Sequence, residues 1–443
     1  MERIFIQNLK DKIGEKVLVA GFVDVRRDHG KLIFIDLRDK SGIIQTVVSP
    51  KHKDAYEILK EVRSEWVLHM TGIVKKRPDN MVNKDSETGD IEIEVSEVTV
   101  LNKAQELPFE KDAELNLDTY LDHLPLTLRS SRGRAIFKVQ AEIIAGYREA
   151  LVALGFTEFQ APKLVGDDAE GGGNVFSVDY FNDKKAYLAT SPQLYKQIMV
   201  GIFERVFSTG NVFRAEKHST TRHLNEYTSL DAELGFITDH RDVMNILTNV
   251  MHHIIARLKK GSAAEYKLLN AELPHAPKEF PFMKLREAHE LIKKETGEDH
   301  TKEPDLDPAD ERWLCEYAAR ELNSDFIFIT HYPIEKRPFY THEDENDHGY
   351  TKSFDLLFRG VEITTGGQRV HEYNKLVEKI QKKGLQPENF SFYLEAFKYG
   401  MPPHGGFGMG LERLTQKFLG LSNVKEATLF PREINRIDML LSQ

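Results

Sequence analysis

Apolar and polar residues alternate along the first hundred positions in the manner of β-strands. The alternating segments 17–25, 31–39 and 42–48 are separated by short polar turns, and a helical segment at 53–63 follows them. Two further strand-like segments cover 66–74 and 91–102, with a polar excursion at 78–90 between them. Five strands with a helix between the third and fourth are typical of an OB-fold barrel, although other small barrels share this order.

The pattern changes after residue 103. Residues 104–130 contain Pro108 and Pro125 and show little periodicity, so we interpret them as a hinge or linker. The segment 130–156 has the apolar spacing of a long amphipathic helix, and 243–258 and 311–323 have the same spacing. We therefore predict a multidomain chain: an all-β barrel at 1–103, the linker, and an α+β domain at 131–443.

Composition narrows the class of protein. The chain of 443 residues has 40% hydrophobic and 29% charged residues, which is typical of a folded globular protein. A single cysteine, Cys315, excludes an internal disulfide and a cysteine-based zinc site. No apolar run is long enough to span a bilayer, and the N-terminus lacks a signal-peptide pattern, so we expect a cytoplasmic protein with no membrane partner.

The net charge of −10 is unevenly distributed. Segment 1–103 has as many basic as acidic residues, so the rest of the chain carries the whole deficit. Basic residues cluster at 26–31 and at 75–77. Such clusters are usually solvated surface, but a neutral module whose cations cluster can still contact phosphates.

Two segments carry candidate phosphate chemistry. In 213–234, Arg214 stands at a strand end and can offer a bidentate fork to a carboxylate or phosphate, and Arg222 and His223 follow in a polar loop. In 404–420, closely spaced glycines precede a helix that carries Arg413 near its start, where anions are favoured. The chain has neither GxxxxGK[ST] nor GxGxxG, so it would bind a nucleotide by another route.

Two more segments carry acids and a capped helix. In 353–373, Asp355 and Glu362 are seven residues apart, so a bend or bulge would be needed if both faced one site. Together they suit Mg²⁺ beside a triphosphate, and solvent-facing acids are the plain alternative. In 188–199, Ser191 and Pro192 can begin a helix that places Gln193 and Lys196 on one face.

Taken together, these segments resemble the class II aminoacyl-tRNA synthetases. GFTEFQAPKL resembles the dimer-building first motif, FRAE…RHLNEYTSLDAEL the second, and GGFGMGLERL the third. An OB fold before such a core marks the subgroup that charges aspartate, asparagine or lysine. SPQLYKQ and GGQR favour aspartate, and RHLNE with GMPPHGGFG resembles the archaeal and eukaryotic branch.

The resemblance implies an aspartate–tRNA ligase that uses ATP and Mg²⁺, acts as a homodimer, and charges tRNA(Asp); whether it also charges tRNA(Asn) stays open. Arg214, Glu362 and Arg413 would be catalytic. The ATP-binding residues would be Arg214, Glu216, Arg222, His223, Leu224, Glu362, Gly410, Leu411, Glu412 and Arg413. L-aspartate would be bound by Glu170, Gln193, Lys196, Arg214, Thr365 and Arg369, and the metal by Asp355, Glu362 and Thr365. Thr365 departs from the serine common in the family but keeps the hydroxyl.

The same resemblance implies that the barrel binds the anticodon. Arg26, Arg27, Phe34 and Gln45 would contact the tRNA, with Phe34 stacking on a base and Gln45 hydrogen-bonding one. Three alternatives remain: an asparaginyl-tRNA synthetase, an ammonia-using asparagine synthetase, which generally lacks the barrel, and a non-catalytic tRNA-binding paralogue, which should have lost motif arginines or acids.

Overall fold

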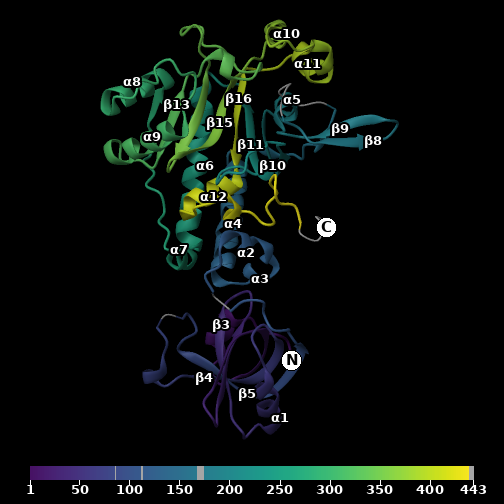
Figure 1. Cartoon of the computed structure of the whole chain (residues 1–443), viewed down its shortest axis with the longest axis vertical. Helices are drawn as coiled ribbons and strands as arrows, with labels where there is room; N and C mark the ends of the chain where they lie inside the picture. The colour runs from purple at the N-terminus through teal and green to yellow at the C-terminus, as the bar shows by residue number, and fades with distance from the viewer. Residues whose placement is uncertain (85, 111–112, 167–173, 439–443) are drawn as a thin grey trace. The chain divides into compact units, whose positions relative to one another are not determined.

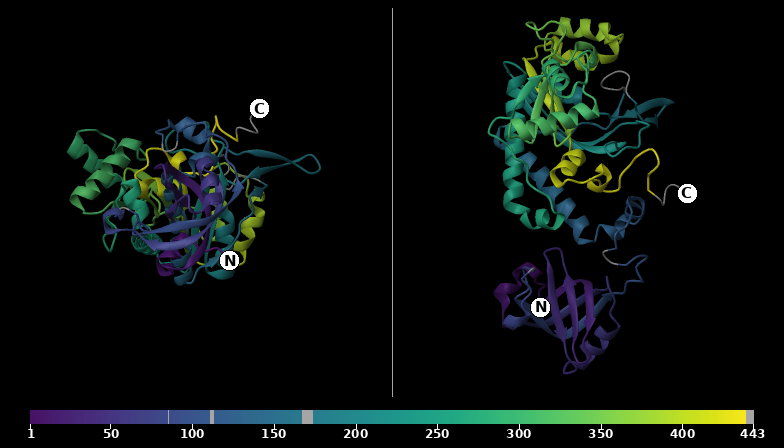
Figure 2. Two further views of the ribbon diagram at one scale, coloured as in Figure 1. Left: turned by 90° about the horizontal axis from the view of Figure 1, so that it is seen from below. Right: turned by 60° about the vertical axis from the view of Figure 1, so that its left-hand side comes forward.

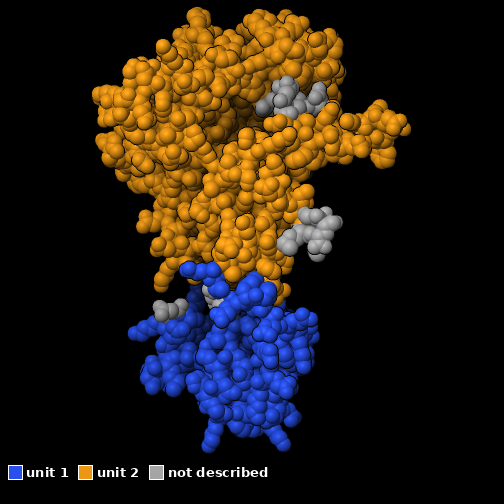
Figure 3. All heavy atoms as spheres, viewed as in Figure 1, with its two compact units in different colours: residues 1–114 blue, residues 115–443 orange. Residues whose placement is uncertain are grey.

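The computed structural model describes residues 1–84, 86–110, 113–166 and 174–438, which form two compact units (Figures 1 and 3). Unit 1 is Met1–Glu114 and unit 2 is Leu115–Gln443. None of the helices in these described ranges is long and apolar enough to cross a membrane.

Unit 1 is a closed five-stranded barrel in the order β1-β2-β3-β5-β4, which confirms the predicted OB fold. Its strands are β1 (Lys16–Asp28), β2 (Ile33–Arg38), β3 (Ile43–Val48), β4 (Val67–Lys76) and β5 (Ile91–Asn102), with α1 (Lys53–Glu61) between β3 and β4. The alternation seen in the sequence sets the two faces: Ile33, Ile35 and Leu37 are fully buried inside the barrel, whereas Phe34 is half-buried on its outside.

Two short helices occupy the second half of segment 104–130, which was expected to be a linker. They are α2 (Leu117–Asp122) and α3 (Leu124–Thr127), and Leu121 and Leu124 are both buried. The boundary between the units accordingly falls between Glu114 and Leu115.

Unit 2 is built on an eight-stranded sheet in the order β12-β13-β14-β15-β16-β11-β10-β6. The strands are β6 (Thr157–Glu158), β10 (Arg205–Phe213), β11 (Glu226–Gly235), β12 (Phe282–Lys284), β13 (Phe326–Thr330), β14 (Ser353–Phe358), β15 (Val361–Arg369) and β16 (His404–Gly410). Its central six strands pair antiparallel, and only the outermost pairs, β12 with β13 and β6 with β10, are parallel. A small sheet of β7 (Leu164–Val165), β9 (Lys184–Leu188) and β8 (Ser177–Tyr180) stands beside it.

Helices pack on this sheet, which confirms the predicted α+β core (Figures 1 and 2). The helices of unit 2 after α3 are α4 (Ser131–Ala153), α5 (Gln193–Phe203), α6 (His240–Gly261), α7 (Ala263–Leu269), α8 (Leu285–Thr296), α9 (Pro308–Glu321), α10 (Tyr373–Lys382), α11 (Ser391–Lys398) and α12 (Leu411–Leu419). Val139 of α4, Leu247 of α6 and Leu230 of β11 share one hydrophobic core. Ser130 begins α4 by accepting a hydrogen bond from Gly133 N, and a capping box at Asp239 begins α6.

A tight hairpin separates Asp355 from Glu362. Arg359 and Gly360 both have positive φ, 46° and 85°, as a two-residue hairpin turn requires. This turn is the bend that their spacing required. The register shift between Leu356 and Leu357 then places Thr365, three residues after Glu362, opposite Asp355.

Candidate functional site

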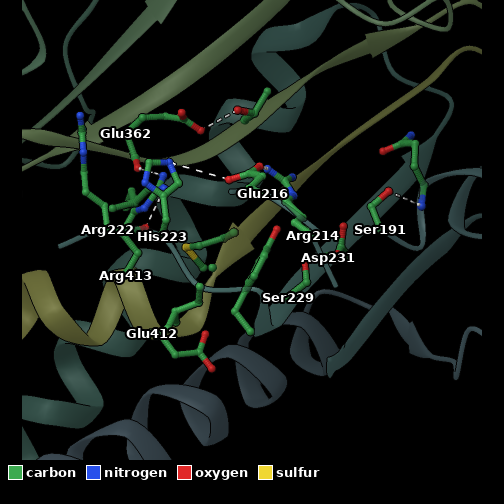
Figure 4. A pocket seen from close by; sticks show the side chains of 18 of the residues that line it. Ser191, Arg214, Glu216, Arg222, His223, Ser229, Asp231, Glu362, Glu412 and Arg413 are labelled. Carbon is green, nitrogen blue, oxygen red and sulfur yellow. Dashed lines mark hydrogen bonds and ion pairs between the residues drawn. The ribbon is translucent and has the colours of Figure 1, made fainter. Parts of the chain in front are cut away.

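A pocket of about 420 Å³ opens in unit 2 over β11, β15 and β16. Its walls also include α5, the start of α12 and the connection between β10 and β11. The predicted site residues that line it are Gln193, Lys196, Arg214, Glu216, Arg222, His223, Leu224, Glu362, Thr365, Arg369, Gly410, Glu412 and Arg413. In Figure 4, Arg222, His223, Glu362 and Arg413 gather at one end, Ser191 and Asp231 lie toward the other, and Arg214 lies between.

The first end is rich in cations. Arg413 Nη1 donates to the Glu362 backbone oxygen at 2.8 Å, and Arg413 Nη2 reaches the Arg222 oxygen at 3.4 Å. His223 shares a hydrogen bond with Thr220 at 2.6 Å, and burial together with Arg413 and Arg222 lowers its pKa. Two fixed guanidinium groups beside a neutral imidazole suit a polyphosphate.

Arg214 stands between the two ends. Its backbone N–H is held by Asn225 O at 2.9 Å, and its side chain, 48% exposed, lies 3.8 Å from Glu216 and over the ring of Tyr227. The exposed guanidinium is therefore presented to the pocket by the first residue after β10.

The other end holds two buried cations and two buried carboxylates, and one of these carboxylates contacts both cations. Arg369 Nε donates to Glu233 Oε1 at 2.9 Å, and Lys196 Nζ lies 3.4 Å from Glu233 Oε2 and 3.0 Å from Asp231 Oδ1. Glu233 is fully buried, but Arg369 and Lys196 overcome the effect of burial and lower its pKa. Two cations and two carboxylates therefore meet at this end of the pocket.

Gln193 and Glu412 complete the pocket wall. Ser191 Oγ accepts from Gln193 N at 3.2 Å, so Ser191 helps to begin α5, and Gln193 itself hydrogen-bonds Gln197. Both oxygens of Glu412 accept from Thr228 N at 3.0 Å. Leu411, by contrast, is buried in the hydrophobic core of unit 2.

The candidate metal ligands lie on the β14–β15 hairpin. Asp355 pairs with Thr365 across the two strands, and Thr365 Oγ1 donates to Glu362 Oε1 at 2.7 Å. Burial raises the pKa of Asp355 to about 6, and Glu362 adds to the rise while Arg337 opposes it. Asp355 Oδ2 accepts from Arg337, but its buried Oδ1 has no hydrogen-bond partner among the described residues. An unsatisfied carboxylate oxygen beside a second acid fits a hard cation such as Mg²⁺.

Several lining residues were not among our candidates. Tyr227, Ser229 and Asp231 line the pocket, and Glu233 follows them, all at alternate positions of β11. Polar residues at every second position of a strand share one face, so the segment 226–235 carried a usable signal. Tyr340, Gly408 and Val424 gave no such local signal. Glu170 lies outside the described residues.

In unit 1, three of the four tRNA candidates meet on the outer face of the barrel. Arg27 donates to Asp36 at 2.7 and 2.8 Å and to Gln45 at 3.3 Å, and Phe34 is the cross-strand neighbour of Arg27. Arg26 points elsewhere and donates to Leu59 O of α1. The face therefore combines a half-buried ring with polar hydrogen-bonding groups.

Both units match families of known proteins. Residues 116–434 match the family described as tRNA synthetases class II (D, K and N), and residues 17–101 match the OB-fold nucleic acid binding domain. The chain belongs to the class II tRNA synthetases of the D, K and N group.

Members of this group resemble the chain along its whole length. The aspartate–tRNA(Asp/Asn) ligase of Thermus thermophilus is 45% identical over 98% of this chain and 99% of its own, and the aspartate–tRNA(Asp) ligase of Pyrococcus abyssi is 40% identical over 96% of each. Among solved structures, asparaginyl-tRNA synthetase from Pyrococcus horikoshii complexed with asparaginyl-adenylate has a TM-score of 0.90 at 32% identity and covers 99% of both chains.

Proposed function

We propose that this class II synthetase is an aspartate–tRNA ligase. It activates L-aspartate with ATP to give aspartyl-adenylate and pyrophosphate, and then transfers the aspartyl group to tRNA(Asp). The observation that carries the proposal is the pair of buried cations, Lys196 and Arg369, which both contact Glu233. Lys196 also contacts Asp231, which lies away from Arg222 and Arg413 in Figure 4. Relatives that are 38–45% identical over nearly their full length carry the name aspartate–tRNA ligase.

The pocket supports this chemistry by position and charge. The aspartate α-carboxylate attacks the α-phosphate in line, pyrophosphate leaves, and no side-chain nucleophile is needed. Arg214 stabilises the charge that develops at the α-phosphate, and Arg222 and Arg413 bind the departing phosphates. Gln193, Lys196 and Arg369 orient the amino acid.

A divalent cation fits the β14–β15 hairpin. Asp355, Glu362 and Thr365 would hold Mg²⁺, which when bound neutralises charge on the phosphate oxygens. Glu216, His223, Leu224 and residues 410–413 would contact ATP. These assignments rest on the lining of one pocket, with two exceptions: Asp355 is only the strand partner of the lining residue Thr365, and Leu411 is buried in the core.

The barrel would bind the anticodon through Arg27, Phe34 and Gln45, because a half-buried ring beside hydrogen-bonding groups suits single-stranded bases. Arg26, which we also predicted, would contribute from the neighbouring surface. A second candidate substrate is tRNA(Asn), since several relatives are named aspartate–tRNA(Asp/Asn) ligase.

We further propose a cytoplasmic homodimer. The short edge strand β6 leaves one side of the large sheet open to pairing. Exposed apolar side chains, which are typical of an interface, also occur at Ile202, Phe203, Phe236 and Tyr399. The segments that carry them are neighbours, because Gly235 N donates to Glu204 O and Met401 lies near Gly201. Sedimentation velocity should give the mass of two chains.

The test of the function is aspartate charging of tRNA(Asp) and tRNA(Asn) side by side, with asparagine as a competitor. We expect aspartate on tRNA(Asp), and charging of tRNA(Asn) as well would establish dual specificity. Arg214→Gln should reduce aspartate-dependent pyrophosphate exchange by about 100-fold or more, because it removes a cation from the reacting phosphate. Arg320→Gln, at an exposed arginine of α9, should leave the rate unchanged. Efficient charging with asparagine instead would overturn the proposal.

A further inference from the structure

Glu311, on α9, contacts the pocket-lining residue Arg222 from outside every motif described above. Arg222 Nη1 donates to Glu311 Oε2 at 2.8 Å, although the two residues are 89 positions apart in sequence. The side chain of Glu311 is only 14% exposed and that of Arg222 is 29% exposed. The contact joins the connection between β10 and β11 to a helix that packs on the sheet.

The two partners differ in how firmly they are held. Glu311 lies in the first turn of α9, which Asp307 caps by accepting from Ala309 N at 2.6 Å and Asp310 N at 2.8 Å. Leu314, one turn further along, is fully buried against the sheet. Arg222, by contrast, belongs to a connection without helix or strand. The carboxylate is therefore the fixed partner, and the guanidinium is the one being positioned.

Placing a charged carboxylate at this position costs free energy, which other interactions must offset. Burial raises the pKa of Glu311, and the nearby Glu362 raises it further, while Arg222 opposes both effects. A negative charge close to a polyphosphate pocket also repels the ligand. The orientation of Arg222 offsets these costs, because a guanidinium has five N–H donors and one contact leaves most of them for a ligand.

We propose that Glu311 is a positioning residue for ATP: it holds the Arg222 guanidinium at the pocket wall, where its remaining donors meet the terminal phosphates. The inference rests on the proposed function, since that function supplies ATP as the ligand of this pocket. Bond making and breaking take place at the α-phosphate beside Arg214. Arg222 therefore contributes binding that the ground state and the transition state share.

Steady-state pyrophosphate exchange separates this role from a structural one. Glu311→Gln should raise the KM for ATP about fivefold, the effect of weakening one partly exposed charge-assisted hydrogen bond. The kcat, the KM for aspartate and the thermal unfolding midpoint should stay close to wild type, because uniform binding affects KM alone. Glu316→Gln is the matched control, since Glu316 is an exposed glutamate of the same helix.

A double-mutant cycle tests whether Glu311 acts through Arg222. In an Arg222→Gln background, Glu311→Gln should cause no further rise in the KM for ATP. An unchanged KM in the single variant, or effects that simply multiply in the double variant, would overturn the inference. Calorimetric titration with ATP alone reports on Glu311 even if the wild-type enzyme rejects aspartate, so failure of the inference and failure of the proposed function remain distinguishable.

Discussion

Two cations and two carboxylates share the end of the pocket that we propose binds the amino acid, and their charges compensate one another. Lys196 Nζ already has three acceptors: Asp231 at 3.0 Å, the Phe407 oxygen at 2.9 Å and Glu233 at 3.4 Å. Arg369 donates through Nε and Nη2 to Glu233 and to Gly406 O. A substrate carboxylate would therefore take its direct hydrogen bond from Arg369 Nη1. It would approach Lys196 by displacing the contact with Glu233, which is the longest of the three.

Glu412 provides a pH-dependent prediction at the same scale. Its burial raises its pKa to about 7, so near neutral pH the folded protein keeps a proton that the unfolded chain has lost. A raised pKa gives stability that is complete below about pH 4.5 and is lost as pH rises through about 7. Glu412→Gln mimics the protonated form, and its amide oxygen can still accept from Thr228 N. The variant should therefore match wild type at pH 4.5 and exceed its free energy of unfolding by about 2 kcal/mol at pH 8.5.

Urea denaturation of both proteins across this pH range provides the measurement. Glu395→Gln, on the exposed side of α11, controls for a simple change of net charge. A constant difference between wild type and Glu412→Gln at all pH values would contradict the prediction.

Sequence patterns identify some residues of the pocket and miss others. Arg214, Lys196 and Arg413 could be found because each stands in a segment whose neighbours share its chemistry. Asp231 could have been found from the alternation in β11. Glu311 could not, because α9 reads as an ordinary amphipathic helix and its functional partner lies 89 positions away.

At the scale of elements, the C-terminal segment at residues 432–433 restrains the connection between β10 and β11. Glu433, 8% exposed, accepts from Ser219 Oγ at 2.6 Å and lies 3.3 Å from Lys425 Nζ. Asn225 N also donates to Arg432 O at 2.8 Å. These contacts therefore hold both the middle and the end of a connection that carries proposed ATP-site residues.

Loosening this restraint should affect dynamics more than stability. Glu433→Ala removes the acceptor of Ser219, so amide hydrogen exchange over residues 217–223 should become several-fold faster, while exchange in α6 stays unchanged. Asn435→Ala is the control, because Asn435 is exposed just after this segment. Equal exchange rates in wild type and Glu433→Ala would show that the C-terminal segment does not restrain the connection.

Element prediction succeeded where local pattern dominates. The barrel strands and α4, α6 and α9 follow their apolar spacing. The closely spaced glycines at 404–410, by contrast, form strand β16. A Cβ on Gly405 would lie 2.7 Å from Gly367 O and one on Gly406 2.2 Å from Ala232 O, so close contact between strands explains these two glycines. That requirement depends on partners far away in sequence.

At the scale of the whole molecule, the two units have separate hydrophobic cores. The core of unit 1 is built from residues between Ile6 and Val95, and the main core of unit 2 from residues between Ile136 and Ala427. Every residue that lines the candidate ATP and aspartate pocket belongs to unit 2. Folding and amino-acid activation should therefore be independent of the barrel, whereas tRNA recognition should need it.

Removing the barrel tests this division. A chain of residues 115–443 should unfold cooperatively and retain aspartate-dependent pyrophosphate exchange within about threefold of wild type, because its core and pocket are complete. Its kcat/KM for tRNA(Asp) charging should fall by about 100-fold or more, since the stacking and hydrogen-bonding face is lost. The full-length Phe34→Ala variant is the companion: stacking on one base is worth about 1–3 kcal/mol, so charging should weaken about 5- to 150-fold with exchange unchanged. Loss of exchange in a truncated chain that still unfolds cooperatively would mean that the barrel takes part in activation itself.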